Sequence, residues 1–286
     1  MQPVPQSAGS GAVAADDHVE SVYSRVSWRI MPLLVICYII AFLDRINIGY
    51  AQLQMKQTLP FSDAVYGLGA GIFFIGYFIF EVPSNLMLEK IGARKTLLRI
   101  MFCWGIVATG MMFVQTPTQF YVLRFLLGAF EAGFFPGVIL YLTYWYPPAR
   151  RGQMIAIFMT ATTLASVIAG PLCGAIMKWM DGINGWHGWQ WLFLVQGLPS
   201  SVLGLVCFFY LQDKPEQAHW LDEGQKKVLR DHLDHDQGLY RRPAPESAAV
   251  RRITRRFPGH PVTEGDEVVE RTAGWQLRRP TAAPAD

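Results

Sequence analysis

Long apolar runs alternate with short polar segments through most of this chain. Six of these runs carry almost no charge over about 20 residues, which is the length that a transmembrane helix needs. Backbone groups in lipid must be hydrogen-bonded within the segment, so such runs form helices. The sequence therefore predicts an all-α integral membrane protein whose six transmembrane helices lie at residues 30–50, 64–86, 97–114, 118–141, 153–178 and 190–211.

Charged residues gather on both sides of this apolar body. Only 16% of the chain is charged, against about 25% in soluble domains. We expect a cytoplasmic N-terminal segment over residues 1–27, a six-helix transmembrane domain over 28–212 and a disordered cytoplasmic tail over 213–286. From about residue 238 arginine and proline dominate, which indicates a truncated or frameshifted reading. The alternative is a natural tail that touches anionic lipid through its arginines.

Lysine and arginine in the loops predict the orientation in the membrane. Loops on the side of the N-terminus carry Arg25, Arg29, Lys90, Arg94, Lys95, Arg99, Arg150 and Arg151. Loops on the opposite side carry only Lys56 and Lys178. We therefore expect a multi-pass protein of the plasma (inner) membrane with both termini in the cytoplasm.

Several classes of function find no support in the composition. A net charge of +3 is too small to indicate nucleic-acid binding. The four cysteines lie in apolar runs without CxxC spacing, so we expect buried thiols rather than a metal or redox site. His232 and His235 are more typical of a solvated helix face than of a metal clamp. No nucleophile–base pair lies inside the spans, so we expect no enzyme, no cofactor and no metal.

Four ionisable residues lie well inside the predicted spans, away from their ends, namely Asp44, Arg45, Arg124 and Glu131. A charge near the middle of a bilayer costs at least about 2.5–3.5 kcal/mol. At 1.5 Å per residue, Arg45 and Arg124 both fall about 9 Å below the outer edge of the membrane, and Glu131 lies about 10 Å deeper on the same helix face as Arg124. These positions predict that the four side chains pair or face a wet cavity.

Two guanidinium groups at one depth would form a receptor for a carboxylate, because each offers planar bidentate hydrogen bonds. The neighbouring acids Asp44 and Glu131 could change protonation as such a site opens and closes. The residues therefore favour a carrier of organic anions that is driven by protons. The alternative is a structural ion-pair cluster that only fixes helix packing.

Glycine and proline occur together in two spans. Residues 133–137 read Gly-Phe-Phe-Pro-Gly and follow Glu131 directly, and residues 170–174 read Gly-Pro-Leu-Cys-Gly. Pro136 and Pro171 each remove one helical hydrogen bond. We expect a bend at each proline.

The loop between the second and third spans resembles the signature of the major facilitator superfamily, Gly-x-x-x-Asp-Arg-x-Gly-Arg-Arg/Lys. This chain has Asn85 in place of the glycine and Glu89 in place of the aspartate. The resemblance implies a loop that closes the cytoplasmic side through charge pairs. Its gating residues would be Glu89, Lys90, Gly92, Arg94 and Lys95, with Arg94, Arg150 and Arg151 as partners of Glu89.

Residues 42–49, 81–85 and 124–137 resemble the anion:cation symporter branch of that superfamily, which includes carriers of tartrate, phthalate and sugar acids. The resemblance implies the N-terminal half of a major facilitator fold, with two inverted three-helix repeats. It also implies that Arg45 and Arg124 hold the substrate carboxylate, and that Asp44 and Glu131 carry the proton.

The partners that the resemblance implies are a small organic anion, protons and the lipid bilayer. A second copy or a missing C-terminal half would complete the transporter, which would work by alternating access. The alternative is a transport-inactive membrane remnant or scaffold.

Overall fold

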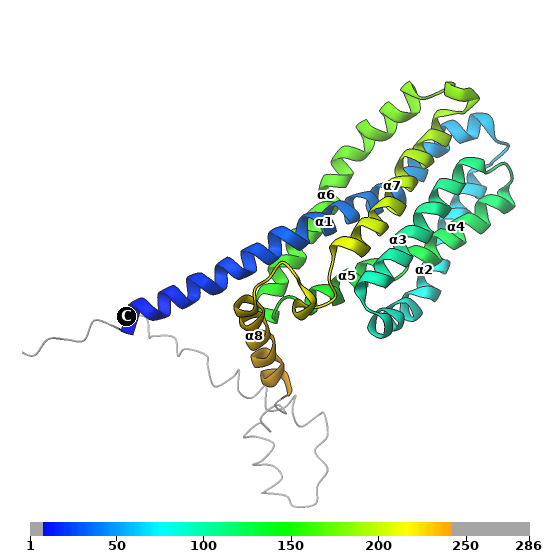
Figure 1. Cartoon of the computed structure of the whole chain (residues 1–286). Coiled ribbons are helices and arrows are strands. Elements are labelled where there is room, and N and C mark those ends of the chain that lie inside the picture. Colours follow the sequence, from blue (N-terminus) through cyan, green and yellow to red (C-terminus); the bar gives the residue numbers. More distant parts are fainter. Residues whose placement is uncertain (1–7, 242–286) are drawn as a thin grey trace, which may run out of the picture. The chain divides into compact units, whose positions relative to one another are not determined.

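The computed structural model describes residues 8–241, and every regular element in that range is a helix (Figure 1). The long helices are α1 (Ala8–Thr58), α2 (Asp63–Ile91), α3 (Ala93–Gly110), α4 (Pro117–Glu131), α5 (Phe134–Thr143), α6 (Pro148–Trp179), α7 (Gly188–Tyr210) and α8 (Glu223–Arg241). Three short 3-10 turns join them: η1 (Met111–Phe113), η2 (Ile183–Gly185) and η3 (Pro215–Gln217).

The six predicted transmembrane helices are confirmed. Within the described residues, six helical segments are long and apolar enough to cross a membrane: Asp17–Thr58, Asp63–Ile91, Ala93–Phe113, Pro117–Thr143, Pro148–Trp179 and Gly188–Tyr210. Most of them extend past the predicted bounds, because a helix can continue into polar flanking sequence where water solvates its side chains. The first span is the extreme case, since α1 begins at Ala8 and runs through Pro32 without interruption.

The fourth span consists of two helices, α4 and α5, with a break between them. The expected bend at Pro136 is wrong in position, because the break falls at Ala132 and Gly133. Pro136 is the third residue of α5, where a missing N–H costs no hydrogen bond within the helix. Gly133 has φ +85°, a left-handed conformation that glycine adopts without strain. The expected bend at Pro171 does not break α6, which is a single helix from Pro148 to Trp179.

The packing of the spans has an internal symmetry. The main contacts join α2 to α4, α1 to α6 and α3 to α7. Exchanging the first three spans with the last three converts the α2–α4 contact into the α6–α1 contact and leaves α3–α7 unchanged. This is the pattern that two inverted three-helix repeats produce.

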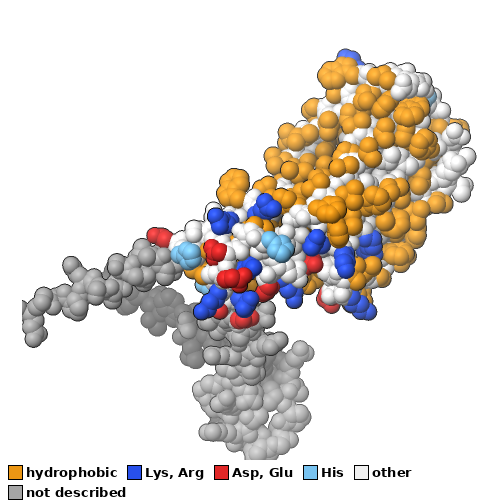
Figure 2. Space-filling view, in the orientation of Figure 1, with side chains coloured by type: hydrophobic (Ala, Val, Ile, Leu, Met, Phe, Trp, Pro, Cys, Tyr) orange, Lys and Arg blue, Asp and Glu red, His pale blue; other side chains and the backbone are white. Residues whose placement is uncertain are grey.

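Apolar side chains cover the outside of the helical body (Figure 2). On α2, Phe78 is 79% exposed and Val82 is 64% exposed. Lysine and arginine gather instead at the end of the body near α8 (Figure 2). A surface of this kind is stable in lipid, where exposed apolar side chains carry no penalty.

The polar segment that follows α7 is folded as far as the structure describes it. We predicted disorder from residue 213, but η3 and α8 occupy much of the range up to Arg241. Leu221 and Leu229 are buried against the body, and Arg25 of α1 donates a hydrogen bond to Gln225 of α8 at 3.2 Å. Hydropathy does not identify this segment, because α8 is a polar helix and not an apolar run. Residues 1–7 and 242–286 lie outside the described residues. Most of the predicted tail, including nearly all of the segment rich in arginine and proline, therefore also lies outside them.

Tyr146, in the loop between α5 and α6, also ties this end of the body together. Its hydroxyl lies 3.0 Å from the Ser27 hydroxyl of α1. Burial raises the pKa of Tyr146 to about 12, so its phenol stays neutral at physiological pH.

Candidate functional site

Asp44 and Arg45 are neighbours in α1 but contact different helices. Asp44 is 1% exposed and accepts hydrogen bonds from Asn47 Nδ2 at 2.9 Å and from the indole N–H of Trp104 on α3. Arg45 instead contacts Glu131, the last residue of α4. Two adjacent residues of the first span therefore contact the third span and the fourth span, respectively.

Arg45 and Glu131 form an ion pair inside the helical body. Arg45 Nε lies 3.0 Å from Glu131 Oε1, and Nη2 contacts the same oxygen. The Glu131 side chain is 2% exposed, whereas that of Arg45 is 33% exposed. A buried carboxylate is stable in its charged form only when a cation or hydrogen-bond donors neutralise it, and Arg45 supplies both. The exposed part of Arg45 leaves donors for a further anion.

Arg124 lies near Phe73 of α2, the same aromatic ring that Arg45 approaches. Its guanidinium carbon is 5.0 Å from the centroid of Phe73, and that of Arg45 is 5.9 Å from the same centroid. Arg124 is 4% exposed, and its Nε donates a long hydrogen bond of 3.4 Å to the carbonyl of Gly69. In the described part of the chain Arg124 has no ion-pair partner. Two arginines thus meet at Phe73, and only one of them is neutralised by direct contact.

The predicted depths of these residues explain part of this arrangement. Arg45 and Arg124 reach a common ring, in keeping with the expectation that they share a depth. Glu131 was expected about 10 Å deeper, yet it contacts Arg45. An arginine side chain is long enough to close this gap by extending along the helix, a factor that a calculation from the backbone rise omits.

The break in the fourth span adjoins the ion pair. Glu131 ends α4, and Gly133 stands between the two helices. A Cβ atom on Gly133 would overlap the side chain of Ser84 on α2, which is buried. The break is therefore held closely against α2.

The predicted gating loop is ordered, but its contacts differ from those expected. Gly92 has φ +88°, and a Cβ there would lie 2.9 Å from an Asp213 carboxylate oxygen. Asp213 accepts the backbone N–H of Arg94 at 2.9 Å, at the start of α3. The Arg94 guanidinium donates to the carbonyl of Phe208 near the end of α7, at 2.9 and 2.6 Å. The loop is thus joined to the end of α7 and the residues that follow it.

The expected pairing of Glu89 with arginines is wrong in this structure. Arg94 binds Phe208 as described, Arg150 pairs with Glu20 at 2.6 Å, and Arg151 donates to the Tyr146 carbonyl at 3.3 Å. Glu89 is exposed, as are Lys90 and Lys95. The signal that could have identified Asp213 is its position, as an acid directly after the last span. Trp104 and Phe73 were missed because aromatic residues are common in every span.

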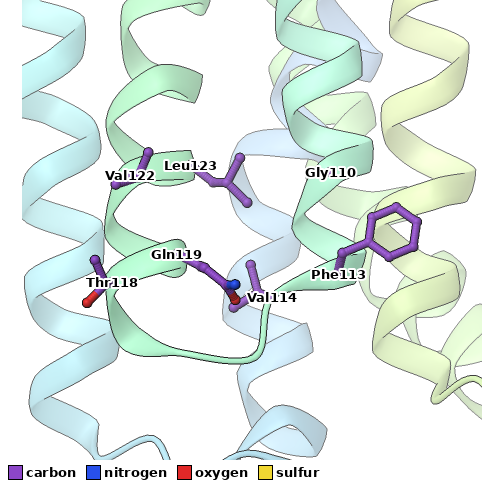
Figure 3. Close-up of a pocket in the computed structure, with 7 residues that line it drawn as sticks. All are labelled: Gly110, Phe113, Val114, Thr118, Gln119, Val122 and Leu123. Atoms are coloured by element: carbon purple, nitrogen blue, oxygen red, sulfur yellow. The ribbon is translucent and has the colours of Figure 1, made fainter.

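A pocket of about 400 Å³ lies elsewhere, between the end of α3, η1 and the start of α4 (Figure 3). Figure 3 shows Phe113, Val114 and Leu123 around it. Its lining residues are uncharged. A site without a cation does not suit an anion, so this pocket is not the candidate site.

Comparison with known proteins identifies the family of the chain. The chain matches the family model of the Major Facilitator Superfamily over residues 34–265. It is 53% identical over 221 residues to NicT, a proposed metabolite transport protein of Pseudomonas putida, covering 77% of this chain and 51% of that protein. It is 52% identical over 217 residues to a proposed tartrate transporter of Agrobacterium vitis, covering 76% of this chain and 48% of that protein.

Among solved structures, a bacterial homologue of the human lysosomal transporter Spinster, inward-facing and unoccupied, matches with a TM-score of 0.59 and 21% identity. The match covers 66% of this chain and 43% of that one. The chain spans about half the length of the curated relatives it matches. By its sequence, its six spans and its fold, the chain belongs to the major facilitator superfamily.

Proposed function

We propose that this chain supplies the N-terminal six-helix half of a transporter that moves small organic anions together with protons. The observation that carries the proposal is the pair of arginines at Phe73, of which Arg45 is neutralised by Glu131 and Arg124 is not. The names of two relatives support an organic anion, and one of them is a proposed tartrate transporter.

Arg45 and Arg124 are the proposed anion receptor. Each guanidinium can offer two parallel N–H groups to a carboxylate, and a dicarboxylate such as tartrate could engage both. Arg124 is 4% exposed, and among the described residues its guanidinium contacts the Gly69 carbonyl and the Phe73 ring but no carboxylate. A cation so poorly neutralised is destabilised by its burial, and a bound carboxylate offsets that cost.

Glu131 and Asp44 are the proposed proton carriers. While Glu131 is ionised it occupies the Arg45 guanidinium and competes with the substrate. A proton on Glu131 ends this competition, so that proton and anion bind together. Asp44 is buried beside Asn47 and Trp104, and its charge also contributes to the potential at Arg124.

Alternating access requires a second six-helix body that rocks against this one. Either the other half of a longer chain or a second copy of this chain could supply it. In this proposal the gating residues Glu89, Lys90, Gly92, Arg94 and Lys95 lie on the cytoplasmic side, as do both termini. The contacts of Arg94 with Phe208 and Asp213 then hold the cytoplasmic end of the third span against that of the sixth span.

Binding of radiolabelled tartrate and related acids to the purified chain in lipid nanodiscs tests the anion receptor. We expect Arg45→Ala and Arg124→Ala each to lower affinity at least about tenfold, the effect of losing one charge-assisted hydrogen-bond pair of about 1.5–3 kcal/mol. Arg29→Ala is the matched control, because Arg29 is also an α1 arginine over an aromatic ring, 4.0 Å from the Tyr210 centroid, but lies away from the site. Wild-type affinity in both receptor variants would exclude this site.

Uptake into proteoliposomes separates the proposal from its alternative. Gradient-driven uptake of one acid supports a proton-coupled carrier. Binding without uptake, in a chain that inserts normally, supports a transport-inactive remnant or scaffold that retains the receptor.

A further inference from the structure

We propose that Trp104 is a positioning residue that couples the charge of Asp44 to the break in the fourth span. The inference rests on the proposed function, because it concerns how a proton on Asp44 would affect the helix that carries Glu131. Trp104 lies in the middle of α3 and is 0% exposed.

Trp104 has two contacts that serve different partners. Its indole N–H donates to the Asp44 carboxylate of α1. Its ring meets the edge of Phe134, with centroids 6.1 Å apart and an interplanar angle of 62°. Phe134 is the first residue of α5 and follows Gly133 directly. A single side chain therefore joins the acid of the first span to the far side of the break.

The near side of the break is joined to the same dipeptide. Arg45, the residue after Asp44, pairs with Glu131 at the end of α4. The two neighbours in α1 thus hold the two sides of the break separately: Arg45 holds the end of α4 directly, and Asp44 holds the start of α5 through Trp104. Events at either residue act on the same break at Ala132 and Gly133.

The Asp44 contact depends on charge. A hydrogen bond to an ionised carboxylate is roughly twice as strong as one between neutral groups. A proton on Asp44 therefore weakens its hold on the Trp104 N–H. The ring can then shift, and because interiors are close-packed, a shift at Trp104 displaces Phe134.

Other groups also face Asp44. Asn47 donates to it from the same helix, and Arg124 and Glu131 of the fourth span lie within electrostatic range. Among these groups, Trp104 has a ring contact with Phe134. Arg124 and Glu131 affect the charge state of Asp44, whereas Trp104 links a change in that charge to the position of Phe134.

The test is pH-dependent hydrogen–deuterium exchange of the whole chain in nanodiscs, followed at peptides that contain residues 132–135. The charge of Asp44 is followed in parallel by the infrared carboxyl band that Asp44→Asn removes. In the wild type we expect exchange at the break to change over the pH range in which this band titrates. Trp104→Phe keeps an aromatic ring but removes the N–H donor, so we expect the band to titrate while the pH-dependent exchange is lost.

Two further variants distinguish coupling from simple loss of packing. Phe134→Leu leaves the Trp104 donor in place and removes the ring contact, so it should also lose the pH-dependent exchange. Trp189→Phe is the matched control, because Trp189 is 2% exposed and its N–H donates to Thr58 at 3.1 Å, away from Asp44. This control should behave as the wild type.

Exchange that still follows pH in Trp104→Phe, or in Asp44→Asn, overturns the inference. A band that does not titrate overturns both the coupling and the proton role of Asp44. Neither result affects the anion receptor, which the tartrate-binding experiment with the arginine variants tests independently.

Discussion

Replacement of Glu131 by glutamine should remove the part of the receptor's pH dependence that arises from competition between Glu131 and the anion. Glutamine has nearly the same shape and can still accept from Arg45, but it cannot carry a charge. In the wild type the ionised carboxylate occupies the Arg45 guanidinium through Nε, at 3.0 Å, and Nη2. Substrate affinity should therefore fall as pH rises and Glu131 loses its proton.

The expected change in affinity follows from the strength of the hydrogen bonds between Glu131 and Arg45, which the substrate must replace. A hydrogen bond involving a charged group contributes about 1.5–3 kcal/mol, and about 1.4 kcal/mol corresponds to a tenfold change in affinity. Glu131→Gln should therefore bind a carboxylate about tenfold to a hundredfold more tightly than the wild type at high pH. At low pH, where Glu131 is protonated in the wild type, the two should bind equally.

The assay is tartrate affinity as a function of pH, measured by calorimetry on the chain in nanodiscs. Glu89→Gln is a matched control, because Glu89 is an exposed acid of the gating loop, and it should bind as the wild type does. An affinity of Glu131→Gln that falls with pH as steeply as in the wild type would refute the competition between Glu131 and substrate.

Substitutions at two other positions test the local geometry by thermal unfolding in nanodiscs. Gly133→Ala should lower stability by at least about 1–2 kcal/mol, because alanine is strained at φ +85° and its Cβ would overlap Ser84; stability equal to the wild type would contradict the described break. Asp213→Ala should lower stability by about 0.5–2 kcal/mol through loss of the acceptor at the Arg94 N–H. Asp213→Asn keeps an acceptor and should lose less, and equal losses in both variants would argue against the capping role.

The sequence alone was sufficient for the architecture of the body. Apolar runs define spans because lipid imposes a minimum length on them, and this constraint does not depend on tertiary contacts. The same constraint identified Asp44, Arg45, Arg124 and Glu131, since a charge inside a span requires an explanation. The ion pair between Arg45 and Glu131 and the ring that both arginines share are consistent with that reasoning.

The partners of individual side chains were harder to predict. Arg94 binds the carbonyl of Phe208 and not the carboxylate of Glu89, because backbone acceptors at a helix end have no sequence signature. Trp104 was hidden among the tryptophans of the apolar runs, where an indole donor and a lipid-facing ring look alike. The sequence predicts the bend at Pro136, and only the backbone conformation of Gly133 identifies that glycine as part of the break.

The symmetric pairing of the spans has a consequence for how the chain is made. α1 packs chiefly on α6 and α7, and α3 packs on α7. The translocon releases spans in order, so α1 leaves the ribosome long before its main neighbours exist. Trp104, the partner of Asp44, and Glu131, the partner of Arg45, are synthesised later than the first span. The newly made first span therefore inserts before Trp104 and Glu131 can pair with its charges, and its packing is complete only when α6 and α7 follow.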